Sequence, residues 1–223
     1  DYGVGDNFKL FPEKFKELDL KWGPHSIDLF AHPGNAQLKR FCGLAKPRKK
    51  SFSRYVYEGR PFDRCWSDEN AWAFPPYAMI EAVLDKVEKD KCELTLLTPL
   101  NTRAPWFLRC VALSLYCPEI LEYSESCMLG YSTDYRDVIT APWGNYVAWR
   151  VSAEPPPMSA RGGVSHVVDE MERIESAAFE ALAVSRKECL PVFGLRWCGR
   201  AQGDGPNAVP SAESVASAFP FPR

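Results

Sequence analysis

The stretch Ala71-Trp72-Ala73-Phe74-Pro75-Pro76-Tyr77 is the part of the chain that decides the fold. Its first four residues are apolar and predict a buried strand. Two adjacent prolines then fix φ at both positions, so the carbonyl of Pro75 is held in one direction. Residues 78–91 carry apolar side chains every three or four positions, as a helix packed on a core does. A strand, a rigid turn and a helix in this order predict one unit of an α/β sheet.

Further segments repeat this alternation of strand and helix patterns. Strands are expected at residues 26–31, 54–57, 71–74, 92–99, 120–123 and 146–151. Helices are expected at residues 12–20, 78–91, 104–115 and 164–188. The alternation predicts a mostly parallel, doubly wound sheet, whose ligands bind at the carboxyl ends of the strands. Asp28, Asp63 and the Pro75-Pro76 turn all lie at or near such ends.

Composition changes after residue 153, which divides the chain into four predicted regions. An α/β domain over residues 1–153 precedes a stiff Pro/Gly linker at residues 154–163. Residues 164–198 form a helical extension, and residues 199–223 form a flexible tail rich in Gly, Pro, Ser and Ala. We expect the extension and the tail to contact protein partners.

The overall composition restricts the partners and the compartment. A net charge of −2 gives no global electrostatic reason to bind nucleic acid. No apolar stretch approaches the roughly 20 residues of a membrane helix. The eight cysteines form no CxxC pair, and the three histidines are not at ligand spacing, so no metal site is expected. Reduced thiols favour an intracellular protein, although the residues do not exclude disulfides or distinguish a nuclear from an organellar compartment. Because the chain begins at Asp1 rather than Met, we expect it to be processed or a fragment.

One basic stretch covers residues 46–54, with five positive charges and no acid. One interpretation is a solvated loop. The other is a loop that contacts DNA phosphates and supplies affinity that does not depend on sequence. The residues that would bind nucleic acid are Lys46, Arg48, Lys49, Lys50 and Arg54.

Several ordered motifs resemble a known family over residues 8–153. The quoted segments are Phe11-Pro12-Glu13-Lys14-Phe15, Trp22 to Ala31, Asn35-Ala36-Gln37-Leu38, Ala73 to Tyr77, Leu97-Thr98-Pro99 and Ala104-Pro105-Trp106-Phe107. They resemble a segment that follows the reverse transcriptase and RNase H regions of DIRS-like retroelements. The same block is similar to phage-type DNA N6-adenine methyltransferases.

That resemblance implies a Rossmann-like methyltransferase fold, S-adenosylmethionine as methyl donor and DNA adenine as acceptor. It places Asp28 and the turn from Ala31 to Asn35 at the methionine end of the donor, and Asp63 near its adenosine. Phe74, Pro75, Pro76 and Tyr77 would then form the catalytic motif that faces the target base, where Tyr77 stacks on a flipped-out adenine.

The motif is degenerate, because active enzymes of this kind carry Asp, Asn or Ser in place of Phe74. That side chain and the following proline carbonyl both accept hydrogen bonds from the target amine. Losing one acceptor typically costs on the order of 10²–10³ in rate. The glycine-rich loop usual after the first strand is also missing, and only Gly34 lies near that place.

We therefore expect a retroelement-derived, methyltransferase-like pseudoenzyme that acts as a structural or interaction subunit and needs no cofactor. The alternatives are an active DNA adenine methyltransferase that uses S-adenosylmethionine, and a nucleic-acid binder without catalysis.

Overall fold

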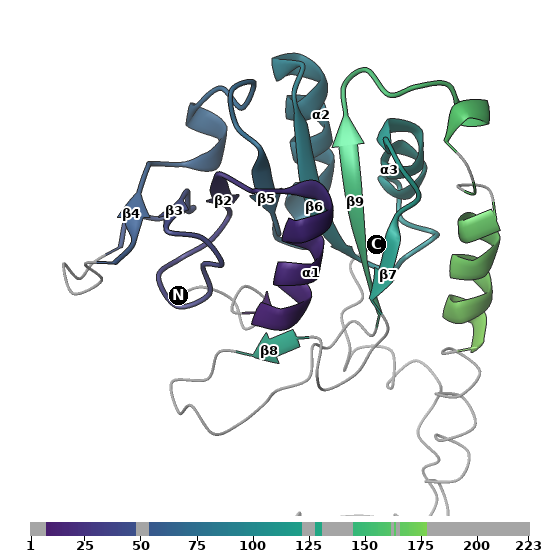
Figure 1. The fold of residues 1–223 in the computed structure, drawn as a ribbon, viewed down its shortest axis with the longest axis horizontal. Helices are drawn as coiled ribbons and strands as arrows, with labels where there is room; N and C mark the ends of the chain where they lie inside the picture. Colours follow the sequence, from purple (N-terminus) through teal and green to yellow (C-terminus); the bar gives the residue numbers. More distant parts are fainter. Residues whose placement is uncertain are drawn as a thin grey trace, which may run out of the picture. The chain divides into compact units, whose positions relative to one another are not determined.

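The computed structural model describes residues 8–47, 54–121, 128–130, 145–161, 163 and 166–177. The chain divides into two compact units, Asp1–Ala181 and Leu182–Arg223, and the second lies outside the described residues. The predicted tail and the end of the helical extension are therefore also outside them. Within the described residues the fold is mixed α/β, with a seven-stranded sheet and four helices (Figure 1). The helices are α1 (Pro12–Trp22), α2 (Ile80–Asp90), α3 (Phe107–Leu113) and residues 166–177.

The main sheet has the order β4-β3-β2-β5-β6-β9-β7. Its strands are β2 (Ile27–Leu29), β3 (Arg40–Phe41), β4 (Val56–Tyr57), β5 (Ala71–Ala73), β6 (Glu93–Pro99), β7 (Glu119–Leu121) and β9 (Tyr146–Ser152). The five strands from β4 to β6 are parallel, whereas β9 runs antiparallel to both of its neighbours. The predicted mostly parallel sheet is confirmed, with one reversed strand inside it.

The expected alternation with helices holds only for the second half of the sheet. Here β5, α2 and β6 form the crossover that the deciding stretch predicts, and α3 follows before β7. Between β2 and β5, the described residues contain only the short 3₁₀ helix η2 (Pro61–Asp63). Turn-forming residues such as Pro33 and Gly34 interrupt this region. The fully buried Trp66 from this region lies in the same apolar cluster as Val83 and Leu84 of α2.

The sheet buries different side chains on its two faces. Ala71 and Ala73 of β5 face the cluster made with α2, α3 and residues 166–177, whereas Trp72 faces α1. This alternation follows from the two-residue period of a strand. The predicted helix faces pack as expected, with Val83 and Leu84 of α2 fully buried.

The segment after β9 is built into the same compact unit. Arg161 is buried, and its guanidinium donates hydrogen bonds to the carbonyls of Pro156, Val111 and Ala112 at 2.5, 3.0 and 2.7 Å. Two of these carbonyls belong to the last turn of α3, where a positive charge also interacts favourably with the negative end of the helix dipole. Met171 of the following helix is 0% exposed and lies in the main core.

Replacement of Arg161 by Met should lower the free energy of unfolding by roughly 2–4 kcal/mol, because buried carbonyls lose their donors while the side-chain volume is kept. Urea denaturation measures this change. The matched control is Arg60→Met, since the Arg60 side chain is exposed. An equal loss in both variants would contradict this role for Arg161.

Candidate functional site

The strand order reverses between β2 and β5, and a small pocket lies at this reversal. At such a point the connections that follow the two parallel strands run to opposite sides of the sheet. A crevice therefore opens at the carboxyl ends of the strands. The pocket is lined by Lys9, Leu10, Asp28, Leu29, Phe30, Ala31, Asn35, Gln37, Trp72 and Phe74. Its volume open to water is about 10 Å³, which is at the lower limit for one water molecule. In this state the pocket is closed to a cofactor-sized ligand.

The pocket brings together several residues that the sequence predicts for a donor and target site. Asp28, Ala31 and Asn35 line it together with Phe74, which comes from the neighbouring strand end. The turn is ordered by Asn35, whose side-chain oxygen accepts a hydrogen bond from the amide of His32 at 2.8 Å. Asp63, in contrast, lies exposed in η2 and does not line the pocket.

Asp28 carries the strongest electrostatic perturbation in the pocket. It is the central residue of β2 and is only 3% exposed. Burial raises its pKa to about 8, although the amide of Gln37 donates a hydrogen bond to Oδ2 at 2.7 Å and opposes that shift. The carboxyl group is therefore largely protonated at neutral pH while the pocket is closed. Because burial is the main cause of this raised pKa, contact with solvent or with a cationic ligand would favour the ionised carboxylate of Asp28.

The Pro-Pro turn lies directly after β5 and positions two aromatic rings. Phe74 is half-buried and packs edge-on against Tyr146, with ring centroids 5.7 Å apart. Pro75 is buried, and the carbonyl of Pro76 accepts a hydrogen bond from Met79 that begins the 3₁₀ helix η3 (Tyr77–Met79). The rigid turn predicted from the two prolines is thus present, and the ring of Phe74 directly precedes it.

Tyr77 is held by the loop that follows β6. Its hydroxyl accepts a hydrogen bond from Asn101 at 3.0 Å, and its ring packs edge-on against Trp106 at 5.6 Å. The next residue, Thr102, donates hydrogen bonds from its amide and its hydroxyl to Glu175 at 3.0 and 2.5 Å. The helix at residues 166–177 therefore supports the loop that holds Tyr77. Nothing in the local sequence indicates these distant contacts.

The basic stretch is described only at its two ends. Lys46 and Arg54 are both exposed, and the Arg54 guanidinium lies over the ring of Tyr55 at 4.9 Å. Arg48, Lys49 and Lys50 lie outside the described residues.

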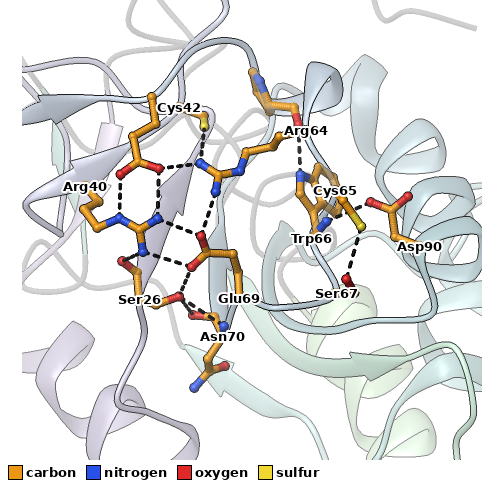
Figure 2. A network of polar contacts seen from close by, with 12 residues as sticks. Ser26, Arg40, Cys42, Arg64, Cys65, Trp66, Ser67, Glu69, Asn70 and Asp90 are labelled. Atoms are coloured by element: carbon orange, nitrogen blue, oxygen red, sulfur yellow. Dashed lines mark hydrogen bonds and ion pairs between the residues drawn. The ribbon is translucent and has the colours of Figure 1, made fainter.

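An ion-pair network missed by the sequence analysis joins the first half of the sheet (Figure 2). Arg40 pairs with Glu58 and Glu69 at 2.5 and 2.7 Å, and Arg64 pairs with the same two carboxylates at 2.5 and 2.7 Å. Hydrogen bonds from Arg40 are the main reason that the pKa of Glu58 falls to about 2. Ser26 donates to Glu69 at 2.5 Å, which extends the network to the start of β2.

This network contains two cations and two anions whose charges balance in ion pairs, so it favours a structural role over ligand binding. It links β3 to the residues after β4 and before β5, where the described chain lacks crossover helices. Its ion-paired residues are up to 29 positions apart along the chain, and Ser26 is 43 positions from Glu69. For this reason no local spacing in the sequence could indicate it.

A second buried polar cluster has the partners of a nucleophilic triad but cannot act as one. His25 Nδ1 lies 2.6 Å from Asp19 Oδ1, and His25 Nε2 lies 2.8 Å from the hydroxyl of Thr95. Burial lowers the pKa of His25 and outweighs the hydrogen bond that its ring makes to the Asp19 carboxylate, which raises the pKa. Thr95 is 0% exposed, so no substrate reaches its hydroxyl. The cluster instead ties α1 to β6.

Comparisons with known proteins identify no family for this chain. No model of a known protein family matches the chain, and no curated protein matches it. Among the described residues, no group of three or more His, Cys, Asp or Glu side chains is placed to hold a metal ion. In the same part of the chain, every helix is too short or too polar to span a membrane.

Asp28→Asn should change how stability depends on pH. Native Asp28 keeps its proton up to about pH 8, whereas the unfolded chain loses it near pH 4. Unfolding between these values releases a proton, so this carboxyl lowers native stability as pH rises from 4 to 8. The difference in unfolding free energy between variant and wild type should therefore grow by roughly 2–5 kcal/mol across this window.

Urea denaturation at several pH values measures that difference. Asp63→Asn is the matched control, because Asp63 is exposed and its removal should leave the wild-type profile unchanged. A constant difference between Asp28→Asn and wild type from pH 4 to pH 8 would show that Asp28 is not desolvated.

Proposed function

We propose that this chain is a retroelement-derived protein with a Rossmann-like methyltransferase fold that transfers no methyl group. It serves instead as a structural or interaction subunit of a larger intracellular assembly. The resemblance over residues 8–153 supports the ancestry, and the geometry of the pocket at the strand reversal supports the loss of chemistry.

The strand order is the main support for the fold class. Rossmann-like methyltransferases share a seven-stranded sheet in which one late strand inserts antiparallel beside the parallel ones. The order β4-β3-β2-β5-β6-β9-β7 follows that arrangement, with β9 as the inserted strand. The reversal between β2 and β5 then corresponds to the place where donor and target base would meet.

The observation that carries the lack of catalysis is Phe74. In the transfer, the amine nitrogen attacks the methyl group of the sulfonium, the sulfur–carbon bond breaks, and the amine later loses a proton. An oxygen acceptor beside the amine stabilises the positive charge that develops there. Phe74 instead offers a ring that packs on Tyr146 and accepts no hydrogen bond. In its closed state the pocket beside it, with about 10 Å³ open to water, also has no room for the donor.

A catalytic role is the second candidate, and one observation favours it. Asp28, Ala31 and Asn35 meet Phe74 in one pocket, as the resemblance implies for a donor site.

A nucleic-acid binder without catalysis would rely on the basic stretch, of which Lys46 and Arg54 are exposed. In this candidate DNA is bound through phosphates alone.

Protein partners are proposed to bind the C-terminal extension and tail. One face of the helix at residues 166–177 is committed to the core through Met171. The opposite face exposes the charged side chains of Asp169, Glu172 and Arg173. A partner would therefore meet a polar helix face, where charge complementarity sets specificity more than affinity.

Transfer of a labelled methyl group from S-adenosylmethionine to adenine-containing duplex DNA tests the proposal. The wild-type chain should give no transfer above the background of heat-denatured protein, because the amine acceptor is missing. Transfer by the wild type that Pro75→Ala and Asp28→Ala abolish, with both variants still folded by circular dichroism, would establish an active enzyme instead.

A further inference from the structure

A separate two-stranded ladder lies beside the pocket and is not part of the main sheet. It consists of β1 (Phe8–Leu10) and β8 (Met128–Gly130), which pair antiparallel from Phe8 with Gly130 to Leu10 with Met128. Two strands alone are at best marginally stable in water. The ladder therefore depends on the contacts that β1 makes with the rest of the molecule.

β1 supplies two of the residues that close the pocket. Lys9 and Leu10 line it together with Asp28 of β2 and Phe74, which follows β5. Leu10 is 1% exposed and belongs to the cluster that includes Trp72. With β1 in this place, the volume open to water is only about 10 Å³. A short segment that precedes the sheet thus forms one part of the pocket wall.

One residue links this segment to the acid at the base of the pocket. The side-chain amide of Gln37 donates a hydrogen bond to the carbonyl of Leu10 at 2.6 Å. Its backbone amide donates to Asp28 Oδ2 at 2.7 Å. Gln37 therefore acts as a latch, because it holds β1 through its side chain and orients the carboxyl group through its backbone.

We propose that β1 is a strap that gates a small-molecule site at the strand reversal. The site takes ligands of the adenosyl amino acid class, and this ligand class rests on the proposed methyltransferase fold. Opening removes Leu10 from the pocket, breaks the Gln37 contact and admits solvent and ligand to Asp28. An ammonium group of the ligand then lies beside Asp28, and its positive charge favours the ionised form of the carboxyl group.

The strap makes ligand binding compete with a structural contact. A ligand that binds only the open form has an apparent affinity reduced by the fraction of molecules that are open. Binding also separates β1 from the core contacts that support its pairing with β8. A protein without catalysis can in this way change its surface when the ligand is present, and the pocket retains a use although Phe74 prevents transfer.

Two variants loosen the strap without altering the strand ends. Leu10→Ala removes the buried side chain, and Gln37→Met removes the latch donor while keeping the side-chain length and the backbone bond to Asp28. Leu20→Ala is the matched control, because Leu20 is 79% exposed on α1. Because Leu10 is a core residue, Gln37→Met keeps the test available if Leu10→Ala does not fold.

Hydrogen exchange at the amides of residues 8–10 measures opening, and calorimetry of the full-length chain with S-adenosylhomocysteine measures binding. Gln37→Met should raise exchange by about five- to tenfold, the effect of one hydrogen bond. Affinity for S-adenosylhomocysteine should rise by a similar factor in that variant. The control Leu20→Ala should match the wild type in both measurements.

The other outcomes distinguish a failure of the strap proposal from a failure of the proposed methyltransferase fold. Unchanged exchange in both variants overturns the strap, whatever the binding result. Faster exchange with no binding by any variant overturns the ligand site and counts against the proposed methyltransferase fold. Faster exchange with equal binding by wild type and variants overturns the gate and supports the fold class.

Discussion

The pairing of β2 with both β3 and β5 is the constraint on which the rest of the structure depends. The chain continues from β2 to β3 on one side and from β5 to β6 on the other. The connections therefore diverge and leave the carboxyl ends of β2 and β5 uncovered. Asp28 and Phe74 meet there although 46 positions separate them along the chain. The pocket, the strap over it and the place of the Pro-Pro turn all follow from this one arrangement.

The two halves of the sheet are stabilised in different ways. From β5 onward, helices cover one face and bury an apolar cluster, which is the usual source of stability in such folds. Before β5, the same cluster continues through Ile27, Leu29 and Trp66. The ion pairs of Arg40 and Arg64 with Glu58 and Glu69 add contacts between segments that no crossover helix joins in the described residues. Around the pocket itself, apolar side chains such as Leu10 and Phe74 line the same small space as the buried acid Asp28.

The sequence predicted the parts of the fold that local patterns encode. The β5–α2–β6 crossover was recognisable because a continuous apolar run is followed, after a rigid turn, by apolar residues at every third or fourth position. The two-residue strand β3 was missed, because pairing with its neighbours rather than an apolar run defines it. The pattern of β9 predicted a strand but not its direction, since an alternating apolar surface is the same in both orientations.

Some of the residues that line the pocket were expected from the sequence, whereas Asp63, also expected at a strand end, does not line it. Asp28, Ala31, Asn35 and Phe74 were all expected near strand ends, and they line one pocket. The strap was missed because β1 pairs with residues about 120 positions away. Contacts such as Gln37 with Leu10 and Thr102 with Glu175 join segments that no short motif connects.

The direction and neighbours of the strands test the central claim most directly, and they can be measured by NMR. The account predicts close Hα–Hα contacts across the antiparallel pair Leu96 and Trp149 or its neighbouring position, together with backbone contacts between β2 and β5 around Asp28 and Trp72. A spectrum in which β9 runs parallel to β6, or in which β2 has no contact with β5, would contradict it.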